Sequence, residues 1–528
     1  MVVPDLISGA QPDDLKTQEF RRHMGTVSRH SAVFFAGTVF TTVLGYAFKV
    51  YLARTLDARA LGIYALGMTI VAFLSLFNSL GLPRAALRYV TTYCATEKFD
   101  LLRGFLLRSL LWLLILNLLF GSVMLLAGPW IAFHFYHTPE IQTYLPLFAL
   151  LMVAGVFSNF FGQVLGAYKN VAGRTVVANF IGTPAKVILT VALVAAGFGL
   201  GGYILAEMIG SFLVLALMIR MAWQRTPAAA RPILATLRRP EIPKLEKEVI
   251  SFSRTSIGLG LLDVLKSQSD RIAVGFYLDA RSVGIYSIVA AMITMVPLVQ
   301  RSVNQIFSST IADLHARGQH ELLKRTFQTV TKWVVGLTFP GAFVMIIYAR
   351  EFMQIFGRGF ASGWIILIIG TVAGLVDCGA RSAGTLLLMS GRQNRLIKIH
   401  GVTTALMIGL NVLLVPRWGL VGAGSAAAVM VAVSNIWFLI DVRRELKFYP
   451  YSSSFLRLIL PLGAVIAALL VLHWRVPLQP GWLGIVVGLL LAYGVFSTVA
   501  LAFSLDGDDR IIARAVWSRL RRPGKTAA

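Results

Sequence analysis

Charged side chains interrupt several long apolar stretches of the sequence, and their types suit the recognition of an anion. The basic ones are Lys49, Arg108, Lys186, Lys266, Arg271, Arg301 and Arg381, and the acidic ones are Glu207, Asp263, Asp270 and Asp377. A charge at the centre of a bilayer costs about 2.5–3.5 kcal/mol on insertion scales, so such groups should face a cavity or a partner. Because Lys and Arg form charge-assisted hydrogen bonds with phosphate, the basic majority predicts a site for an anionic headgroup.

Some of these charges can also be explained by pairing. Asp377 and Arg381 are four residues apart and share one face of a helix. Asp263, Lys266 and Asp270 follow the spacing i, i+3, i+7 and can balance one another. A buried ion pair that fixes helix packing therefore stays open beside a role in binding or ion coupling.

A repeated stretch organises the chain. Residues 56–64 read Leu-Asp-Ala-Arg-Ala-Leu-Gly-Ile-Tyr, and residues 278–286, which begin 222 positions later, read Leu-Asp-Ala-Arg-Ser-Val-Gly-Ile-Tyr. Gly199-Leu200 likewise returns as Gly419-Leu420. Several matches in the same order predict an internally duplicated protein. The repeat also aligns Lys49 with Arg271.

Composition places the duplicated unit in a membrane. Of the 528 residues, 57% are hydrophobic and 14% are charged, which is too little charge for a soluble protein of this length. Apolar runs long enough to cross a bilayer recur throughout. They predict an all-α, polytopic protein with fourteen spans, near 33–52, 61–82, 105–127, 143–168, 175–196, 203–219, 255–277, 283–308, 333–348, 364–389, 399–415, 421–440, 458–474 and 482–504.

The positions of Lys and Arg orient these spans. Most basic residues fall in segments that are cytoplasmic if both termini lie inside, as the positive-inside rule requires. The net charge of +25 is therefore mainly a topology signal, and nucleic acid is not an expected partner. The predicted organisation is a cytoplasmic tail (1–32), a six-helix lobe (33–219), a basic linker (220–254), a second six-helix lobe (255–440), an additional helix pair (441–504) and a basic cytoplasmic tail (505–528).

The repeat suggests where a substrate would bind. Two lobes inserted in the same direction should be related by an axis along the membrane normal, which places Lys49 and Arg271 at equivalent heights in a common cleft. Snorkelling of Lys49 at the end of its span is the alternative. The predicted substrate-binding residues are Lys49, Arg84, Arg88, Lys186, Lys266, Arg271, Arg301 and Arg381. The candidates for ion coupling are Glu207, Asp263, Asp270 and Asp377.

Motifs for covalent catalysis and for cofactors are missing from the sequence. Gly524-Lys525-Thr526 resembles the end of a phosphate-binding loop, but Arg519 stands where that loop needs glycine. Cys94 and Cys378 are too few for a metal site. We therefore expect no cofactor, no metal and no enzymatic activity, which leaves transport.

The layout resembles the multidrug/oligosaccharidyl-lipid/polysaccharide exporter superfamily. Several short sequence motifs are similar to those of its polysaccharide branch, the Wzx-type flippases. It includes Leu61-Gly62-Ile63-Tyr64, Gly81-Leu82-Pro83 and Phe356-Gly357-Arg358-Gly359-Phe360. The resemblance implies an alternating-access transporter that moves undecaprenyl-pyrophosphate-linked oligosaccharides from the inner to the outer leaflet.

The expected function is therefore to flip such a lipid-linked O-antigen, exopolysaccharide or capsule unit across a bacterial inner membrane. Its expected partners are the lipid-linked oligosaccharide, membrane lipids, a glycan polymerase and glycosyltransferases. The alternatives are a multidrug or cation antiporter, which needs an acid-lined cavity, and a flippase for a peptidoglycan precursor. A membrane glycosyltransferase or polymerase is disfavoured, because the predicted outer loops are short and no acidic active site is apparent.

Overall fold

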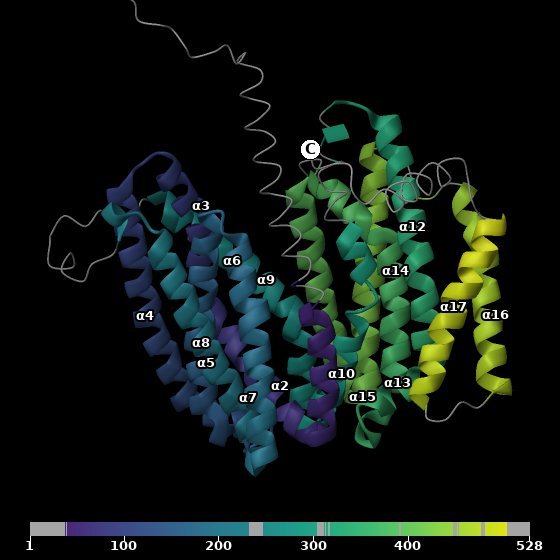
Figure 1. The fold of residues 1–528 in the computed structure, drawn as a ribbon, viewed down its shortest axis with the longest axis horizontal. Coiled ribbons are helices and arrows are strands. Elements are labelled where there is room, and N and C mark those ends of the chain that lie inside the picture. Colours follow the sequence, from purple (N-terminus) through teal and green to yellow (C-terminus); the bar gives the residue numbers. More distant parts are fainter. Residues whose placement is uncertain are drawn as a thin grey trace, which may run out of the picture. The chain divides into compact units, whose positions relative to one another are not determined.

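The structure is a computed structural model, and it is helical (Figure 1). It describes residues 37, 40–231, 247–303, 311, 313–314, 317–389, 392–446, 451, 453–476 and 481–503. No strand occurs within these ranges, so the predicted all-α class is confirmed. The predicted tails (1–32 and 505–528) and residues 232–246 of the predicted linker lie outside the described residues.

The chain divides into two compact units, each made of several segments. The first unit contains residues 1–49, 70–130 and 142–261, and the second contains residues 50–69, 131–141 and 262–528. Two long helices, α2 (Ala58–Asn78) and α9 (Lys247–Tyr277), contribute residues to both units. The lobe boundaries expected from the repeat, 33–219 and 255–440, stay a prediction.

The other helices divide between the two units. In the first unit they are α3 (Leu82–Ala95), α4 (Phe99–Trp130), α5 (Ile141–Ala167), α6 (Val171–Thr175), η2 (Val176–Gly182), α7 (Thr183–Leu193), η3 (Val194–Phe198), α8 (Gly199–Arg225) and η4 (Ala228–Ala230). In the second unit they are η1 (Ile131–Phe135), α10 (Ala280–Ile293), α12 (His320–Ile347), α13 (Ala349–Ile355), η6 (Arg358–Gly363), α14 (Trp364–Met389), α15 (Gln393–Leu446), η7 (Ser453–Leu458), α16 (Ile459–Arg475) and α17 (Gly481–Phe503).

Within the described ranges, nine helical segments are long and apolar enough to cross a bilayer. Two of them, Val171–Arg225 and Asn394–Arg444, each cover two of the predicted spans. The helix α9 has 31 residues but is less apolar, because Asp263, Lys266, Asp270 and Arg271 fall in its second half. A polytopic membrane fold is confirmed, and the fourteen predicted spans are consistent with it.

Glycine breaks both double-length segments. Gly199 has φ 50° and ψ −132°, and Gly419 has φ 57° and ψ −135°. This backbone conformation is open to glycine and strained for other residues. The two glycines are the repeat pair seen in the sequence, so the same break separates consecutive spans in both halves of the chain.

The repeated nine-residue stretch starts a helix in each copy. The Oδ1 atom of Asp57 accepts a hydrogen bond from the backbone N–H of Ala60, and Oδ1 of Asp279 accepts one from Ser282; both distances are 2.7 Å. Each aspartate therefore caps the first turn of its helix, α2 or α10. This explains why the Asp stands at the same place in both copies.

The two copies also pack against each other within the second unit. A Cβ atom added to Gly62 would overlap the carbonyl oxygen of Ala280, and one added to Gly284 would overlap the carbonyl oxygen of Ala58. Ala280 and Ala58 are themselves equivalent in the repeat. The contact between α2 and α10 is thus reciprocal, and it needs glycine on both sides.

Apolar side chains fix the helices that surround the site in the second unit. One cluster joins α12, α14 and α15 through Phe327, Leu386 and Val442. Another joins α12 to the pair α16 and α17, which lie side by side (Figure 1). The helices α14 and α15 are held along much of their length, so polar side chains between them have fixed positions.

Candidate functional site

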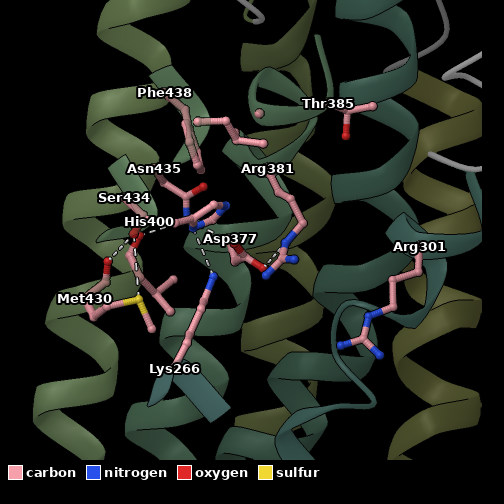
Figure 2. Close-up of a pocket in the computed structure, with 13 residues that line it drawn as sticks. Lys266, Arg301, Asp377, Arg381, Thr385, His400, Met430, Ser434, Asn435 and Phe438 are labelled. Atoms are coloured by element: carbon pink, nitrogen blue, oxygen red, sulfur yellow. Dashed lines mark hydrogen bonds and ion pairs between the residues drawn. The ribbon is translucent and has the colours of Figure 1, made fainter. Parts of the chain in front are cut away.

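Four of the predicted site residues line one cavity in the second unit (Figure 2). They are Lys266 from α9, Arg301 from the helical residues 298–303, and Asp377 and Arg381 from α14. The cavity has a volume of about 430 Å³, within the roughly 300–1,000 Å³ common for ligand sites. The rest of the lining comes from Gly384 and Thr385 of α14 and from Leu396, His400, Met430, Val431, Ser434, Asn435 and Phe438 of α15.

The ion pair expected from the spacing on α14 is present. The Nε atom of Arg381 donates to Oδ2 of Asp377 at 2.6 Å, and the other carboxylate oxygen, Oδ1, accepts from Nδ2 of Asn435 at 3.1 Å. Asp377 is buried, whereas 45% of the Arg381 side chain is exposed. The carboxylate is therefore held in place, and it engages only the Nε edge of the guanidinium, which leaves the two Nη groups for an anion.

Lys266 meets a residue that the sequence analysis did not single out. Its Nζ atom lies 3.2 Å from Nδ1 of His400, which comes from α15 (Figure 2). An ammonium group can only donate, so Nδ1 is the acceptor and a neutral imidazole must carry its proton on Nε2. His400 thus fixes the direction of the Lys266 side chain.

Asp270 and Arg271 belong to a different polar cluster. The hydroxyl of Tyr286 donates to Oδ2 of Asp270 at 2.6 Å, and Nη1 of Arg271 donates to Oε1 of Gln268 at 3.0 Å. Gln268 also accepts from Thr69 of α2 at 3.3 Å. This cluster links α9 to α2 and α10, and neither Asp270 nor Arg271 lines the cavity. Asp263 is an exposed residue of α9, one turn before Lys266.

The remaining candidates lie in the first unit. Lys186 of α7 pairs with Glu207 of α8 at 2.9 Å, so a predicted substrate contact and a predicted coupling acid engage each other. Arg84 donates to the carbonyl of Ser256 at 3.2 Å, and Arg88 lies over the ring of Phe252. Lys49 lies 5.1 Å from the ring centre of Tyr46. Because Lys49 and Arg271 belong to different units, their pairing stays a prediction.

In the part of the chain that the structure describes, no group of three or more His, Cys, Asp or Glu side chains is placed to hold a metal ion. The cavity is instead a place where three basic side chains and one engaged carboxylate face the same space. Such a site can bind an anion through directed N–H donors.

Comparisons with known proteins concern the family and the fold of the chain. A family model described as "Polysaccharide biosynthesis protein" matches residues 51–364. The chain is 22% identical to the probable flippase AglR of Haloferax volcanii, over 92% of this chain and 98% of that one. Its fold is similar to the lipid II flippase MurJ in an inward closed conformation (TM-score 0.70, 14% identity, 89% and 98% of the two chains). It is also similar to an inward-facing multidrug transporter of the MATE family (TM-score 0.64, 14% identity, 77% and 94%).

Proposed function

Since this chain belongs to the polysaccharide biosynthesis protein family and has the fold of the MOP-superfamily flippases, we propose that it flips a polyprenyl-pyrophosphate-linked oligosaccharide across the membrane. In a bacterial cell the carrier would be undecaprenyl pyrophosphate and the membrane the inner membrane, with both termini in the cytoplasm. Glycosyltransferases would supply the substrate and a glycan polymerase would consume it.

The observation that carries the proposal is the charge of the cavity. Lys266, Arg301 and Arg381 face it, and its one acidic lining residue, Asp377, is already engaged by Arg381 and Asn435. A pyrophosphate is a dense anion that satisfies several N–H donors at once. In a membrane-embedded site these donors lose less energy to competing water than they would at a soluble surface.

The same charge balance disfavours a cation antiporter. A cationic drug needs carboxylates that are available to it, whereas three of the four Lys, Arg, Asp and Glu residues that line the cavity are basic. The membrane potential also suits an anionic substrate. An inside-negative potential favours outward movement of negative charge by about 2.3 kcal/mol per charge per 100 mV.

The other predicted contacts would act along the path. We place Lys49 and Arg271 at an anionic headgroup on the axis between the repeats, with Arg84 and Arg88 near its cytoplasmic entry. Lys186 would also act on the substrate along this path, with its positive charge partly balanced by its ion-pair partner Glu207. Proton coupling through Asp263, Asp270, Asp377 or Glu207 is part of the same proposal.

Flipping can be tested with the purified full-length protein in proteoliposomes. The substrate is a fluorescent polyprenyl-pyrophosphate disaccharide, and its transfer is followed by accessibility to a membrane-impermeant quencher. We expect the wild type to accelerate transfer over protein-free vesicles. The triple variant Lys266→Ala, Arg301→Ala, Arg381→Ala should lose this acceleration.

A matched control is available on the surface. Arg317 also pairs with an aspartate one turn earlier, Asp313, at 2.8 Å, but its side chain is 65% exposed. The Arg317→Ala variant should therefore transfer the fluorescent lipid at the wild-type rate. A folded triple variant that transfers the lipid at the wild-type rate would disprove the anion site. A wild type that transfers the lipid no faster than protein-free vesicles would disprove the proposed function itself.

A further inference from the structure

The orientation of one amide in the cavity wall is fixed by its neighbours. Asn435 on α15 is 2% exposed. Its Nδ2 atom donates to Oδ1 of Asp377 at 3.1 Å and to the backbone carbonyl of Val431 at 2.9 Å. Both of these neighbours can only accept, so the nitrogen must face them and the carbonyl oxygen Oδ1 must face the other way.

That oxygen has no donor within the described part of the chain. Among the described residues, Oδ1 of Asn435 is a buried atom without a hydrogen-bond partner. Figure 2 shows the amide on the cavity side of α15, near His400 and Arg381. A buried acceptor without a donor is uncommon in folded proteins and calls for a specific explanation. In the wall of a cavity, the explanation we adopt is a ligand that brings an O–H or N–H group.

The neighbours of this oxygen suit a sugar ring. The rings of His400 and Phe438 meet edge to face, with centroids 5.7 Å apart, and both line the cavity. Thr385 of α14 adds a hydroxyl elsewhere in the cavity lining. A sugar presents apolar C–H faces and hydroxyl donors together, and this wall offers an aromatic surface and a neutral acceptor together.

One carboxylate connects this neutral wall to the basic one. Asp377 accepts from Asn435 with Oδ1 and from Arg381 with Oδ2. A phosphate bound by the Nη groups of Arg381 and a hydroxyl bound by the Asn435 oxygen would therefore be held by two side chains that share Asp377 as a partner. A phosphate and the sugar attached directly to it are two neighbouring groups of one ligand that could make these two contacts.

We propose that Asn435 is a specificity-determining residue, whose Oδ1 atom accepts a hydrogen bond from the first sugar of a glycosyl phosphate bound at Arg381. The proposal rests on the proposed function and deepens it, because it names the residue that would recognise the sugar next to the phosphate. Asp377 is the positioning residue that sets the spacing between the two contacts.

Two soluble probes separate a sugar contact from a phosphate contact. Glucose 1-phosphate and cyclohexyl phosphate carry the same phosphate and a six-membered ring, but only the first has hydroxyls on the ring. Their affinities for the full-length protein in nanodiscs can be measured by calorimetry, for the wild type and for Asn435→Leu. We expect the preference for glucose 1-phosphate to fall by about three- to tenfold in the variant, the range of one neutral hydrogen bond.

The ratio of the affinities for the two esters also distinguishes a direct sugar contact from an effect transmitted through Asp377. If Asn435 acted only through Asp377, the variant would weaken both esters by the same factor, and the unchanged ratio would overturn the sugar contact. Asn411→Leu is the matched control, since Asn411 is another buried asparagine of α15 and does not line the cavity. It should leave the ratio at the wild-type value.

The wild type alone keeps the proposal testable if Asn435→Leu does not fold. Single-deoxy analogues of glucose 1-phosphate should include at least one that binds about threefold or more weakly. Equal affinity across the series would overturn the sugar contact and leave the anion site standing. Failure of every phosphate ester to bind the wild type would instead overturn the anion site and the sugar contact together.

Discussion

Gly62 and Gly284 occupy equivalent positions of the internal repeat, and each lies against the first turn of the other's helix. The contact joins α2 to α10 through backbone atoms, with Ala280 opposite Gly62 and Ala58 opposite Gly284. Side-chain substitution at either glycine must therefore push the two helices apart.

We expect Gly62→Ala and Gly284→Ala each to destabilise the folded protein by about 1–3 kcal/mol, the usual effect of overpacking a close contact. Thermal unfolding of the purified protein in detergent measures this. Gly409→Ala in α15 is the control, because no described atom beyond its chain neighbours and its own helix backbone lies within 4 Å of the added Cβ. Unfolding midpoints equal to that of the control would contradict the close contact.

Arg381→Ala should weaken the binding of inorganic pyrophosphate by about 10- to 150-fold, which corresponds to roughly 1.5–3 kcal/mol for a hydrogen bond to a charged group. The affinity of Arg381→Lys for pyrophosphate should lie between those of the wild type and of Arg381→Ala, because lysine keeps the charge and loses the forked geometry. The exposed Asp313–Arg317 pair has the same spacing, so Arg317→Ala should bind like the wild type. Equal losses in the two alanine variants would point to a general charge effect.

Lys49→Ala and Arg271→Ala should each strongly reduce export of surface glycan at normal protein levels, if one headgroup meets both cations. Lys49→Arg should retain more activity than Lys49→Ala, because the positive charge is the main requirement. Arg108→Ala, near the predicted membrane surface, should be nearly silent. Normal export in the double variant Lys49→Ala, Arg271→Ala would leave these residues with a structural role.

The Lys186–Glu207 pair offers a test of structure against function. Removing one partner leaves an uncompensated, mostly buried charge, so Glu207→Gln should destabilise the protein by about 3–5 kcal/mol. The double variant Lys186→Met, Glu207→Gln should recover most of this stability in thermal unfolding. If the stable double variant also transports normally, Lys186 is neither a substrate contact nor part of proton coupling.

The membrane helices could be predicted well wherever apolar length alone decides the structure. The expected span 364–389 coincides with α14, and 482–504 differs from α17 by one residue at each end. The helix α3 was missed as an element. Its buried face includes Leu82, Ala85 and Tyr89, but Arg84 and Arg88 interrupt the apolar run, and a span-length criterion does not detect an amphipathic helix of 14 residues.

The site could be predicted only where its contacts are local in sequence. Asp377 and Arg381 are one helical turn apart, so their pairing follows from spacing. His400 lies 134 residues from Lys266, and Asn435 lies 58 residues from Asp377. No periodicity connects positions that far apart, because the packing of α9, α14 and α15 brings them together. The only sequence signal for His400 and Asn435 as site residues was that each is a polar residue in an apolar stretch.

Every residue that lines the cavity belongs to the second unit. A group held there keeps the same set of contacts in whatever direction that unit faces. A ligand that binds two conformations equally well does not change the balance between them, however tightly it binds. The cavity can therefore confer selectivity without driving reorientation. The free-energy difference for each cycle has to come from elsewhere: from the membrane potential acting on the phosphate charge, or from the parts of the substrate that extend beyond this unit.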